Sequence, residues 1–236
     1  SNMDLYQPHF KEKYTHKHSV YTAAFIDHLE KLLPKEFNKE EWGIEDSFVK
    51  LAAGHHKPQT ALQWIIAVAD RVSSGYDRKT FDDYNHEINV KDYKKTRLLT
   101  LFEGIDNPKE DKLEAYDYRY PLREISPKNI FPIRSDNSHG ADYSEEYREL
   151  FFKFVCAIEK LEHKDTIPLW LEHYDSIFCI YCSHIPAATV GFVVPDVSLY
   201  DHSKMTSALS SALYLYHKSN NSFKIEDIQD YEKKKF

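Results

Sequence analysis

Residues Gly54–Arg78 read GHHKPQTALQWIIAVADRVSSGYDR. A histidine pair stands in a Gly/Pro turn, and the long apolar run that follows is interrupted by a single acid, Asp70. An acid inside an apolar helix is costly unless another group pairs with it. Histidine and aspartate are also ligand types that bind divalent metal ions. The stretch therefore predicts a helix beside either half of a metal site or a buried structural pair.

Helical signals continue on both sides of this stretch. Thr60 is a plausible N-cap for the helix after the histidine turn, and Ser198–Asp201 fits a capping box. Residues from about 80 to 142 are instead polar and carry short β-like pieces at Arg97–Phe102 and Tyr116–Leu122. We therefore expect a mainly α fold with a small, partly β insertion at about 80–142. The expected helices are Thr15–Leu33, Ile44–Ala53, Ala61–Ser74, Ser144–Glu162, Leu169–Tyr181 as one helix or two short ones, and one beginning near Val197. The expected inward faces are His18, Thr22, Phe25, Leu29 and Leu32 in the first helix and Met205, Leu209, Ala212, Leu213 and Tyr216 in the last.

Composition narrows the classes of protein to consider. Only 6 Gly in 236 residues argues against a turn-rich all-β fold. A net charge of −7 provides no general field for nucleic acid, so any such contact must be local or come through a partner. Three cysteines form no disulfide framework, which favours a reducing compartment and a cytoplasmic location. No apolar run reaches the roughly 18 residues that a membrane span needs, so we expect no membrane association.

The candidate metal ligands lie at the ends of apolar stripes. His18 begins the stripe of the first expected helix, and His202 begins that of the last. His55 and His56 stand just before the helix that carries Asp70. If these helices form a bundle, the imidazoles and the carboxylate could converge at one end of the core. Such a cluster could bind a divalent ion and lower the pKa of a bound water, which would give a hydrolytic nucleophile.

Structural explanations of the same residues stay open. A single histidine at the end of an apolar stripe is usually a boundary residue with its hydrogen bonds satisfied. Asp70 stands next to Arg71, so it could form an ion pair or cap a neighbouring helix. The pair His55–His56 could face solvent in its turn.

Three segments of the chain resemble a known family. They are His55–Pro58 with Leu62–Arg78, then Pro195–Thr206, and less closely Tyr118–Pro132. Together they resemble, in the same order, the large subunit of type III CRISPR effector complexes, the Csm/Cmr large-subunit family. The first two matches are long and specific, and the three span most of the chain.

The resemblance implies a fold and a function. The N-terminal region of that family looks like a circularly permuted helical domain of the HD superfamily, a metal-dependent phosphohydrolase fold. In the family it cleaves single-stranded DNA when target RNA is bound, as part of antiviral defence. Its partners are the other subunits of a ribonucleoprotein with guide RNA, and two palm domains follow downstream. We accordingly expect residues 1–236 to form a single HD-like domain.

The resemblance also implies roles for individual residues. His202 corresponds to the first histidine of the HD set and Asp70 to its last aspartate, so both would be catalytic metal ligands. His18, His55 and His56 match histidine-bearing segments and would complete the metal site. The expected cofactor is a divalent transition metal such as Mn or Ni. The residues that would contact substrate phosphate are Lys57 and Arg71.

The sequence departs from the family pattern in two ways. It contains no Gly-Gly-Asp-Asp motif of the palm, and it lacks the His-Asp dipeptide expected upstream of His16–Ser19. The doublet either lies outside this sequence or has been lost. We therefore expect little or no nuclease activity from this chain alone. The alternative function is a non-catalytic scaffold that docks palm domains and neighbouring subunits; a stand-alone nucleotide phosphohydrolase is a third hypothesis, against which the match at Asp196–Thr206 argues.

Overall fold

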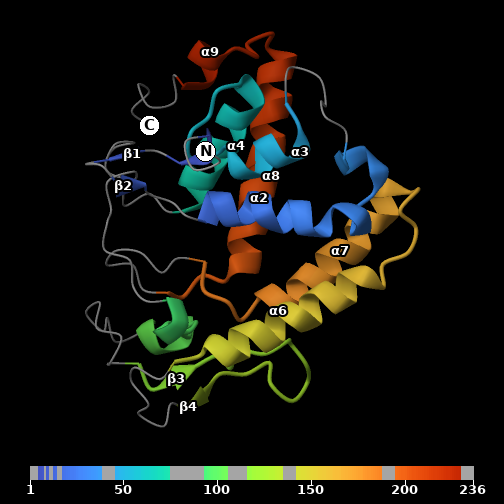
Figure 1. Ribbon diagram of the computed structural model, residues 1–236. Coiled ribbons are helices and arrows are strands. Elements are labelled where there is room, and N and C mark those ends of the chain that lie inside the picture. Colours follow the sequence, from blue (N-terminus) through green and yellow to red (C-terminus); the bar gives the residue numbers. More distant parts are fainter. Residues whose placement is uncertain are drawn as a thin grey trace. The chain divides into compact units, whose positions relative to one another are not determined.

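The computed structural model describes residues 5–7, 9–10, 13–14, 18–38, 46–74, 93–105, 116–134, 142–187 and 195–229. Helices make up most of these residues, which confirms the prediction of a mainly α fold (Figure 1). Contacts divide the chain into two compact units, residues 1–86 with 204–236 and residues 87–203. The single HD-like domain over residues 1–236 stays a prediction beside this division.

Among its described residues, the first unit has helices and one short antiparallel hairpin. Its hairpin, helices and 3₁₀ turns are β1 (His9–Phe10), β2 (Lys13–Tyr14), α2 (His18–Leu29), η1 (Glu30–Leu32), η2 (Lys35–Asn38), α3 (Phe48–Ala53), α4 (Ala61–Ser73), the later part of α8 (Leu199–Ser219) and α9 (Ile225–Gln229).

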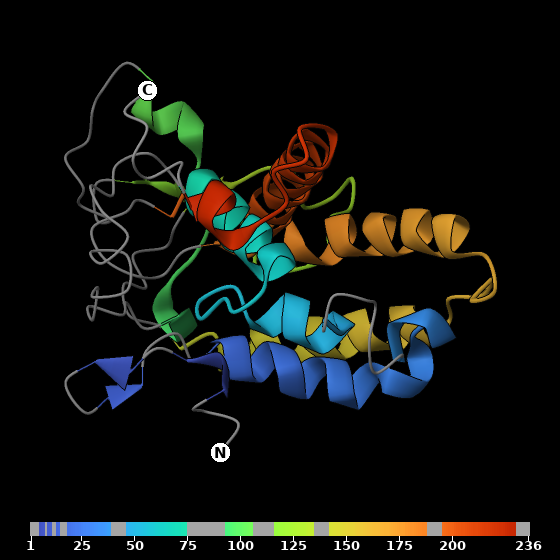
Figure 2. The same ribbon diagram turned by 90° about the horizontal axis from the view of Figure 1, so that it is seen from above.

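Helix α2 packs along α3, and the two lie side by side in both ribbon views (Figures 1 and 2). Of the predicted inward stripe Leu29 is buried, but His18 is exposed and Phe25 is only half-buried. The rest of the buried face carries Ser19, Ala23 and Ile26 instead. Small side chains explain the difference, because Ala23 packs against Ala53 of α3, and two alanines let the helix backbones approach closely. His18 is thereby left exposed at the helix start.

Helix α4 begins and is buried as the sequence predicts. The Thr60 hydroxyl caps it by accepting a hydrogen bond from the backbone N–H of Gln63 at 3.2 Å. Its apolar side chains Ile65 and Val68 share a core with Ile228 of α9, a helix that the sequence analysis missed in a polar segment. Figure 2 shows α9 beside α4. The C-terminal segment thus completes the core around α4.

The second unit is built on a helical hairpin. Helix α6 (Ser144–Glu159) carries buried Leu150, Phe154 and Ile158. Helix α7 (Ile167–Cys182) adds a run of stacked rings, with centroids 5.2 Å apart for Trp170 and Tyr174. Such aromatic pairs contribute roughly 0.5–1.5 kcal/mol beyond their buried area. The elements of this unit are η3 (Tyr93–Lys95), η4 (Leu101–Gly104), β3 (Tyr118–Arg119), β4 (Ile133–Arg134), α6 (Ser144–Glu159), α7 (Ile167–Cys182) and the first turn of α8.

The predicted β pieces are only partly strands. Tyr116–Leu122 contains β3, which pairs antiparallel with β4. Arg97–Phe102 is not a strand: Leu99 makes one isolated bridge to Arg119, and the chain then turns into η4. Most of the remaining predicted insertion, residues 80–92, 106–115 and 135–141, lies outside the described residues.

Helix α8 begins as predicted, but several of its side chains that were predicted to face inward are exposed. The Ser198 hydroxyl accepts from the backbone N–H of Asp201 at 3.0 Å and donates to its carboxylate at 2.6 Å, which confirms the cap. Of the predicted inward face, Leu209 and Leu213 are half-buried, whereas Met205, Ala212 and Tyr216 are exposed. The helix buries few of its own side chains because it contacts the α4 core mainly through Leu213 and Tyr214.

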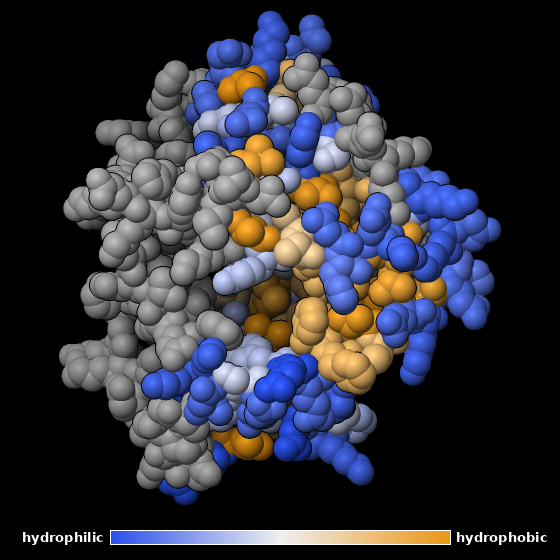
Figure 3. Space-filling model, viewed as in Figure 1, coloured by the Kyte–Doolittle hydropathy of each residue, from blue (hydrophilic) through white to orange (hydrophobic). Residues whose placement is uncertain are grey.

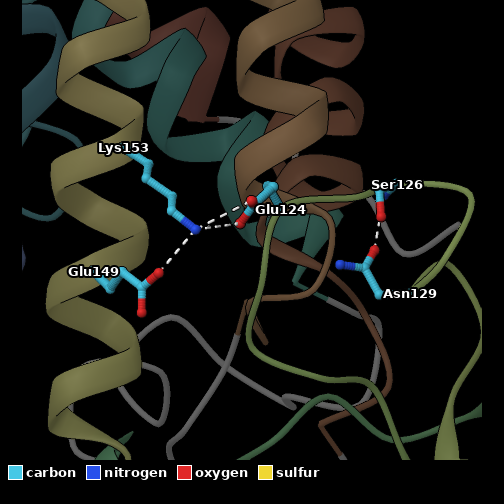
Figure 4. Close-up of polar contacts among 5 residues, drawn as sticks. All are labelled: Glu124, Ser126, Asn129, Glu149 and Lys153. Carbon is cyan, nitrogen blue, oxygen red and sulfur yellow. Dashed lines mark hydrogen bonds and ion pairs between the residues drawn. The ribbon is translucent and has the colours of Figure 1, made fainter.

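A cluster of polar contacts joins α6 to the loop after β3. The Lys153 ammonium lies between two carboxylates, 3.1 Å from Oε1 of Glu124 and 2.8 Å from Oε1 of Glu149 (Figure 4). In the same loop the backbone N–H of Ser126 donates to Oδ1 of Asn129 at 2.7 Å. All of these groups are at least partly exposed, so the cluster positions the loop more than it stabilises the fold.

In the part of the chain that the structure describes, no helix is both long and apolar enough to cross a membrane.

Candidate metal centre

Three histidine side chains meet at one point of the first unit. His18 is the first residue of α2, and His55 and His56 form the turn between α3 and α4. One ring nitrogen of each lies within 4.8 Å of the others. Of the described histidine, cysteine and acidic residues, these three form the group suited to hold a metal ion. The predicted convergence of His18 with the histidine pair is therefore seen in the fold.

The three rings differ in burial. His18 is exposed, His55 is half-buried, and His56 is only 4% exposed. The ring of His56 is in contact with both others, with centroid distances of 4.6 Å to His18 and 4.2 Å to His55. The group is thus anchored on its inner side by His56 and open to solvent on the side of His18, so a substrate could reach an ion held there.

One hydrogen bond sets the tautomer of His55. Its Nδ1 lies 3.0 Å from the carbonyl oxygen of Ala52, and only a protonated Nδ1 can donate to a carbonyl. The lone pair of Nε2 is then free. Metal-binding histidines almost always donate their second ring N–H to a carbonyl or carboxylate in this way. His55 is therefore prepared as an Nε2 ligand.

The other two rings share a contact. Nε2 of His18 and Nε2 of His56 are 2.7 Å apart, a distance at which one nitrogen donates and the other accepts. An ion between these rings would take both lone pairs and displace the shared proton. Imidazole nitrogens bind Zn²⁺ at about 2.0–2.1 Å in a tetrahedral shell, so two nitrogens on one ion lie about 3.3 Å apart. The three rings fit one ion with small movements.

The donor set is consistent with a transition metal. Imidazole suits zinc, copper, iron and nickel, whereas magnesium and calcium prefer oxygen ligands. Catalytic zinc sites commonly use three protein ligands and keep a position for water or substrate. Three histidines open to solvent match this arrangement.

The remaining predicted residues of the first unit are not part of this group. Asp70 is half-buried on α4, and Lys57 is exposed directly after His56. Neither is a member of the three-histidine group. The guanidinium of Arg71 lies 5.4 Å from the centre of the Trp64 ring, a cation–π contact that gives it a structural role. The ligand role of Asp70 and the phosphate roles of Lys57 and Arg71 stay predictions.

His202 belongs to the second unit. It is half-buried in the first turn of α8, and its backbone N–H donates to the carbonyl of Ser198 at 3.0 Å. Its role as a ligand also stays a prediction.

A buried carboxylate that was not predicted from the sequence lies next to the histidine turn. Asp46 is 0% exposed and accepts hydrogen bonds from Thr60 and Gln63, at the start of α4. The available signal was an acidic pair, Glu45 and Asp46, just before an apolar helix. It is weak, because an aspartate at such a position usually caps its own helix, and here Ser47 does so.

The chain has clear relatives among curated proteins, although no protein-family model matches it. It is 28% identical over 209 residues to the CRISPR system single-strand-specific deoxyribonuclease Cas10/Csm1 (subtype III-A) of Enterococcus italicus, covering 82% of this chain and 25% of the relative. The protein of the same name from Methanocaldococcus jannaschii is 26% identical over 233 residues, covering 94% of this chain and 26% of that protein. This chain is a homologue of the type III-A Cas10/Csm1 large subunits.

Further comparisons concern the same group. Cas10/Csm1 of Mycobacterium tuberculosis is 24% identical over 225 residues, or 86% of this chain and 26% of the relative. A solved structure of a Csm1–Csm4 cassette in complex with cA4 has a TM-score of 0.49 at 21% identity, over 86% of this chain and 25% of that one. The chain spans about a quarter of the length of the Cas10/Csm1 relatives that it matches.

Proposed function

We propose that this chain is the metal-binding, HD-like nuclease part of a type III-A CRISPR large subunit. The observation that carries the proposal is the group of His18, His55 and His56, with imidazole nitrogens close enough to share one ion. The names of the relatives, single-strand-specific deoxyribonucleases, supply the substrate class. In the complete protein the activity would be metal-dependent cleavage of single-stranded DNA, within a complex that contains further subunits and guide RNA.

The residues of this chain would divide the work by their positions. His56, almost fully buried, would fix the ion from the inner side, and His55 would bind through the Nε2 that its bond to Ala52 leaves free. When bound, an ion of this kind supplies Lewis-acid activation of a phosphodiester and of water. The exposed ammonium of Lys57, next to His56, would neutralise phosphate charge. Asp70, on α4 of the same unit, would add a carboxylate ligand.

Metal binding is tested first, on the untagged chain. We expect Ni²⁺ or Mn²⁺ titrated by calorimetry to bind one site, and His56→Ala to weaken that binding by at least about tenfold. His28→Ala is the matched control, because His28 is an exposed histidine of the same unit and lies outside the group. Equal affinity in the wild type and in His56→Ala would overturn the metal site.

Cleavage is tested next. For the isolated chain we expect little or no nuclease activity, because the sequence lacks the His-Asp dipeptide of the family pattern and its metal shell is therefore incomplete. In the full-length large subunit, assembled with its complex, we expect His56→Ala and Asp70→Ala each to abolish cleavage of single-stranded DNA. Robust metal-stimulated cleavage by the isolated chain, lost in Asp70→Ala, would show that the isolated chain is a complete enzyme.

A second candidate function is that of a docking scaffold, and the surface of the second unit favours it. Phe102 and Phe131 are each 77% exposed, and Phe152 on α6 is 67% exposed. Figure 3 shows hydrophobic side chains, in orange, at the surface over α6 and α7. The test is co-purification of the chain with the remaining part of the large subunit. If Phe131→Ser weakens co-purification and leaves metal affinity unchanged, the result supports a docking role that is separate from the metal site.

A further inference from the structure

A buried polar network lies against the histidine turn. The Asp46 carboxylate, 0% exposed, accepts from the Thr60 hydroxyl at 2.6 Å and from the Gln63 side-chain amide at 2.8 Å. Gln63 is itself only 5% exposed. A buried carboxylate is tolerated only where donors surround it, so the two donors and Asp46 form one interdependent unit.

The same network holds both ends of the turn. At its exit, the backbone N–H of Gln59 donates to Oε1 of Gln63 at 2.9 Å. At its entrance, Gly54 lies so close that a Cβ there would stand 3.1 Å from that same oxygen. The side chain of Gln63 therefore touches the residue before His55 and a residue shortly after His56. Asp46 fixes the orientation of that side chain, because it receives the amide N–H.

We propose that Asp46 is a positioning residue for the histidine centre, acting through Gln63 and Thr60 on His55 and His56. Its role in metal binding rests on the proposed function, while its role in holding the turn can be measured without metal. Residues that orient metal ligands typically change metal affinity by 10–100-fold when they are replaced. Asp46 touches no ligand itself, so its effect must pass through the backbone of the turn.

The donor pattern requires one carboxylate and one amide in this pair. With Asp46→Asn, every orientation of the two amides leaves one donor without an acceptor, since the Gln59 N–H and the Thr60 hydroxyl both need oxygens. With Gln63→Glu, two carboxylates face each other in a buried place.

The double exchange, Asp46→Asn with Gln63→Glu, restores the pattern. The amide introduced at position 46 would donate to one oxygen of the carboxylate introduced at position 63, and the other oxygen would accept from the N–H of Gln59. The amide oxygen at position 46 would still accept from the Thr60 hydroxyl. Rescue by the double variant is thus a signature that general loss of stability does not produce.

The experiment compares the wild-type chain, the two single variants and the double variant. Ni²⁺ affinity is measured by calorimetry, and hydrogen exchange is followed at the amides of Lys57 and Gln59, whose N–H groups donate to the carbonyl of Gly54 and to Oε1 of Gln63. We expect Asp46→Asn to weaken Ni²⁺ binding about tenfold and to speed exchange at both amides. We expect the double variant to recover affinity to within roughly threefold of wild type. Ile228→Val is the control, since it loosens the buried α4–α9 core.

Each outcome decides a separate question. If the single variants bind Ni²⁺ like wild type and the turn amides exchange no faster than in Ile228→Val, the positioning role is wrong while the metal site stands. If wild type and His56→Ala bind Ni²⁺ equally, the proposed function fails. In that case hydrogen exchange at the turn still tests the positioning role. If exchange is faster in Asp46→Asn and returns to the wild-type rate in the double variant, Asp46 positions the turn. A double variant worse than both singles would overturn the inference.

Discussion

Replacing Gly54 by alanine should destabilise the first unit, although this substitution usually has the opposite effect. Gly→Ala at a compatible site stabilises by about 0.4–1 kcal/mol, because it restricts the unfolded chain. The backbone of Gly54, with φ at −87°, is one that alanine adopts easily. On local conformation alone, alanine should therefore be the better residue here.

The surroundings of Gly54 reverse that expectation. A Cβ would stand 2.5 Å from the carbonyl oxygen of Lys50, so these atoms must separate by at least about half an ångström. The same carbonyl accepts the N–H of Gly54 at 2.9 Å, and that bond ends α3. Gln63 cannot move aside, since it is bonded to Asp46 and to Gln59. Overpacking of this kind costs about 1–3 kcal/mol, so we expect a net loss of roughly 1–2 kcal/mol after the gain in the unfolded chain.

The assay is urea unfolding followed by far-UV circular dichroism, with Ni²⁺ affinity as a second readout. We expect the midpoint to fall and the affinity to drop, because the strain lies directly before His55. Gly54→Ser should behave like Gly54→Ala, since both add the same Cβ. A midpoint that rises for Gly54→Ala would refute the reasoning, because it would mean that the carbonyl of Lys50 yields without cost.

Three further changes have outcomes that follow from described contacts. Thr60→Val should lower stability by about 1–3 kcal/mol in urea unfolding, because it removes a helix cap and a donor to a buried carboxylate; Thr60→Ser should behave nearly as wild type, and equal losses in both would contradict the role of the hydroxyl. Burial, followed by the nearby Cys179, raises the pKa of the Cys182 thiol from 9.0 to about 12. The folded state then holds this proton more tightly than the unfolded state, so the free energy of unfolding falls as pH rises from about 9 toward 12, by about 1.4 kcal/mol at pH 10. Urea unfolding at pH 8 and at pH 10 should show a smaller fall in Cys182→Ala than in the wild type. An equal fall in both proteins would contradict the role of this thiol. Lys153→Met should cost less than about 1 kcal/mol and less still in high salt, because the carboxylates around Lys153 are partly exposed; a salt-independent loss above about 2 kcal/mol would contradict a surface role.

Local signals in the sequence predict the helix starts well. Thr60 and Ser198 were expected as caps, and both side chains accept the predicted backbone N–H. A cap depends on a side chain and a backbone only three residues away, so the sequence contains all of the information. The burial of α2 and α8 depends instead on which neighbour packs against them. The close approach of Ala23 and Ala53 is a tertiary feature, and no periodicity of α2 alone contains it.

The same distinction applies to the candidate site. Histidine and aspartate could be selected as ligand types from the sequence, because their chemistry is intrinsic. Which of them meet could not be read, since His18 and His56 are 38 positions apart. Asp46 was overlooked because its burial depends on the fold of the turn that it supports.

The core shared by α4 and α9 has a consequence for the order of folding during synthesis. Residues 87–203 emerge from the ribosome after α4 and before α9, and they form a compact unit of their own. At about 5–20 residues per second, this interval lasts on the order of ten seconds. Throughout it the apolar face formed by Ile65 and Val68 lacks its partner Ile228. We therefore expect the second unit to fold first. During this interval the first unit is incomplete, and we expect chaperone binding or aggregation to begin there.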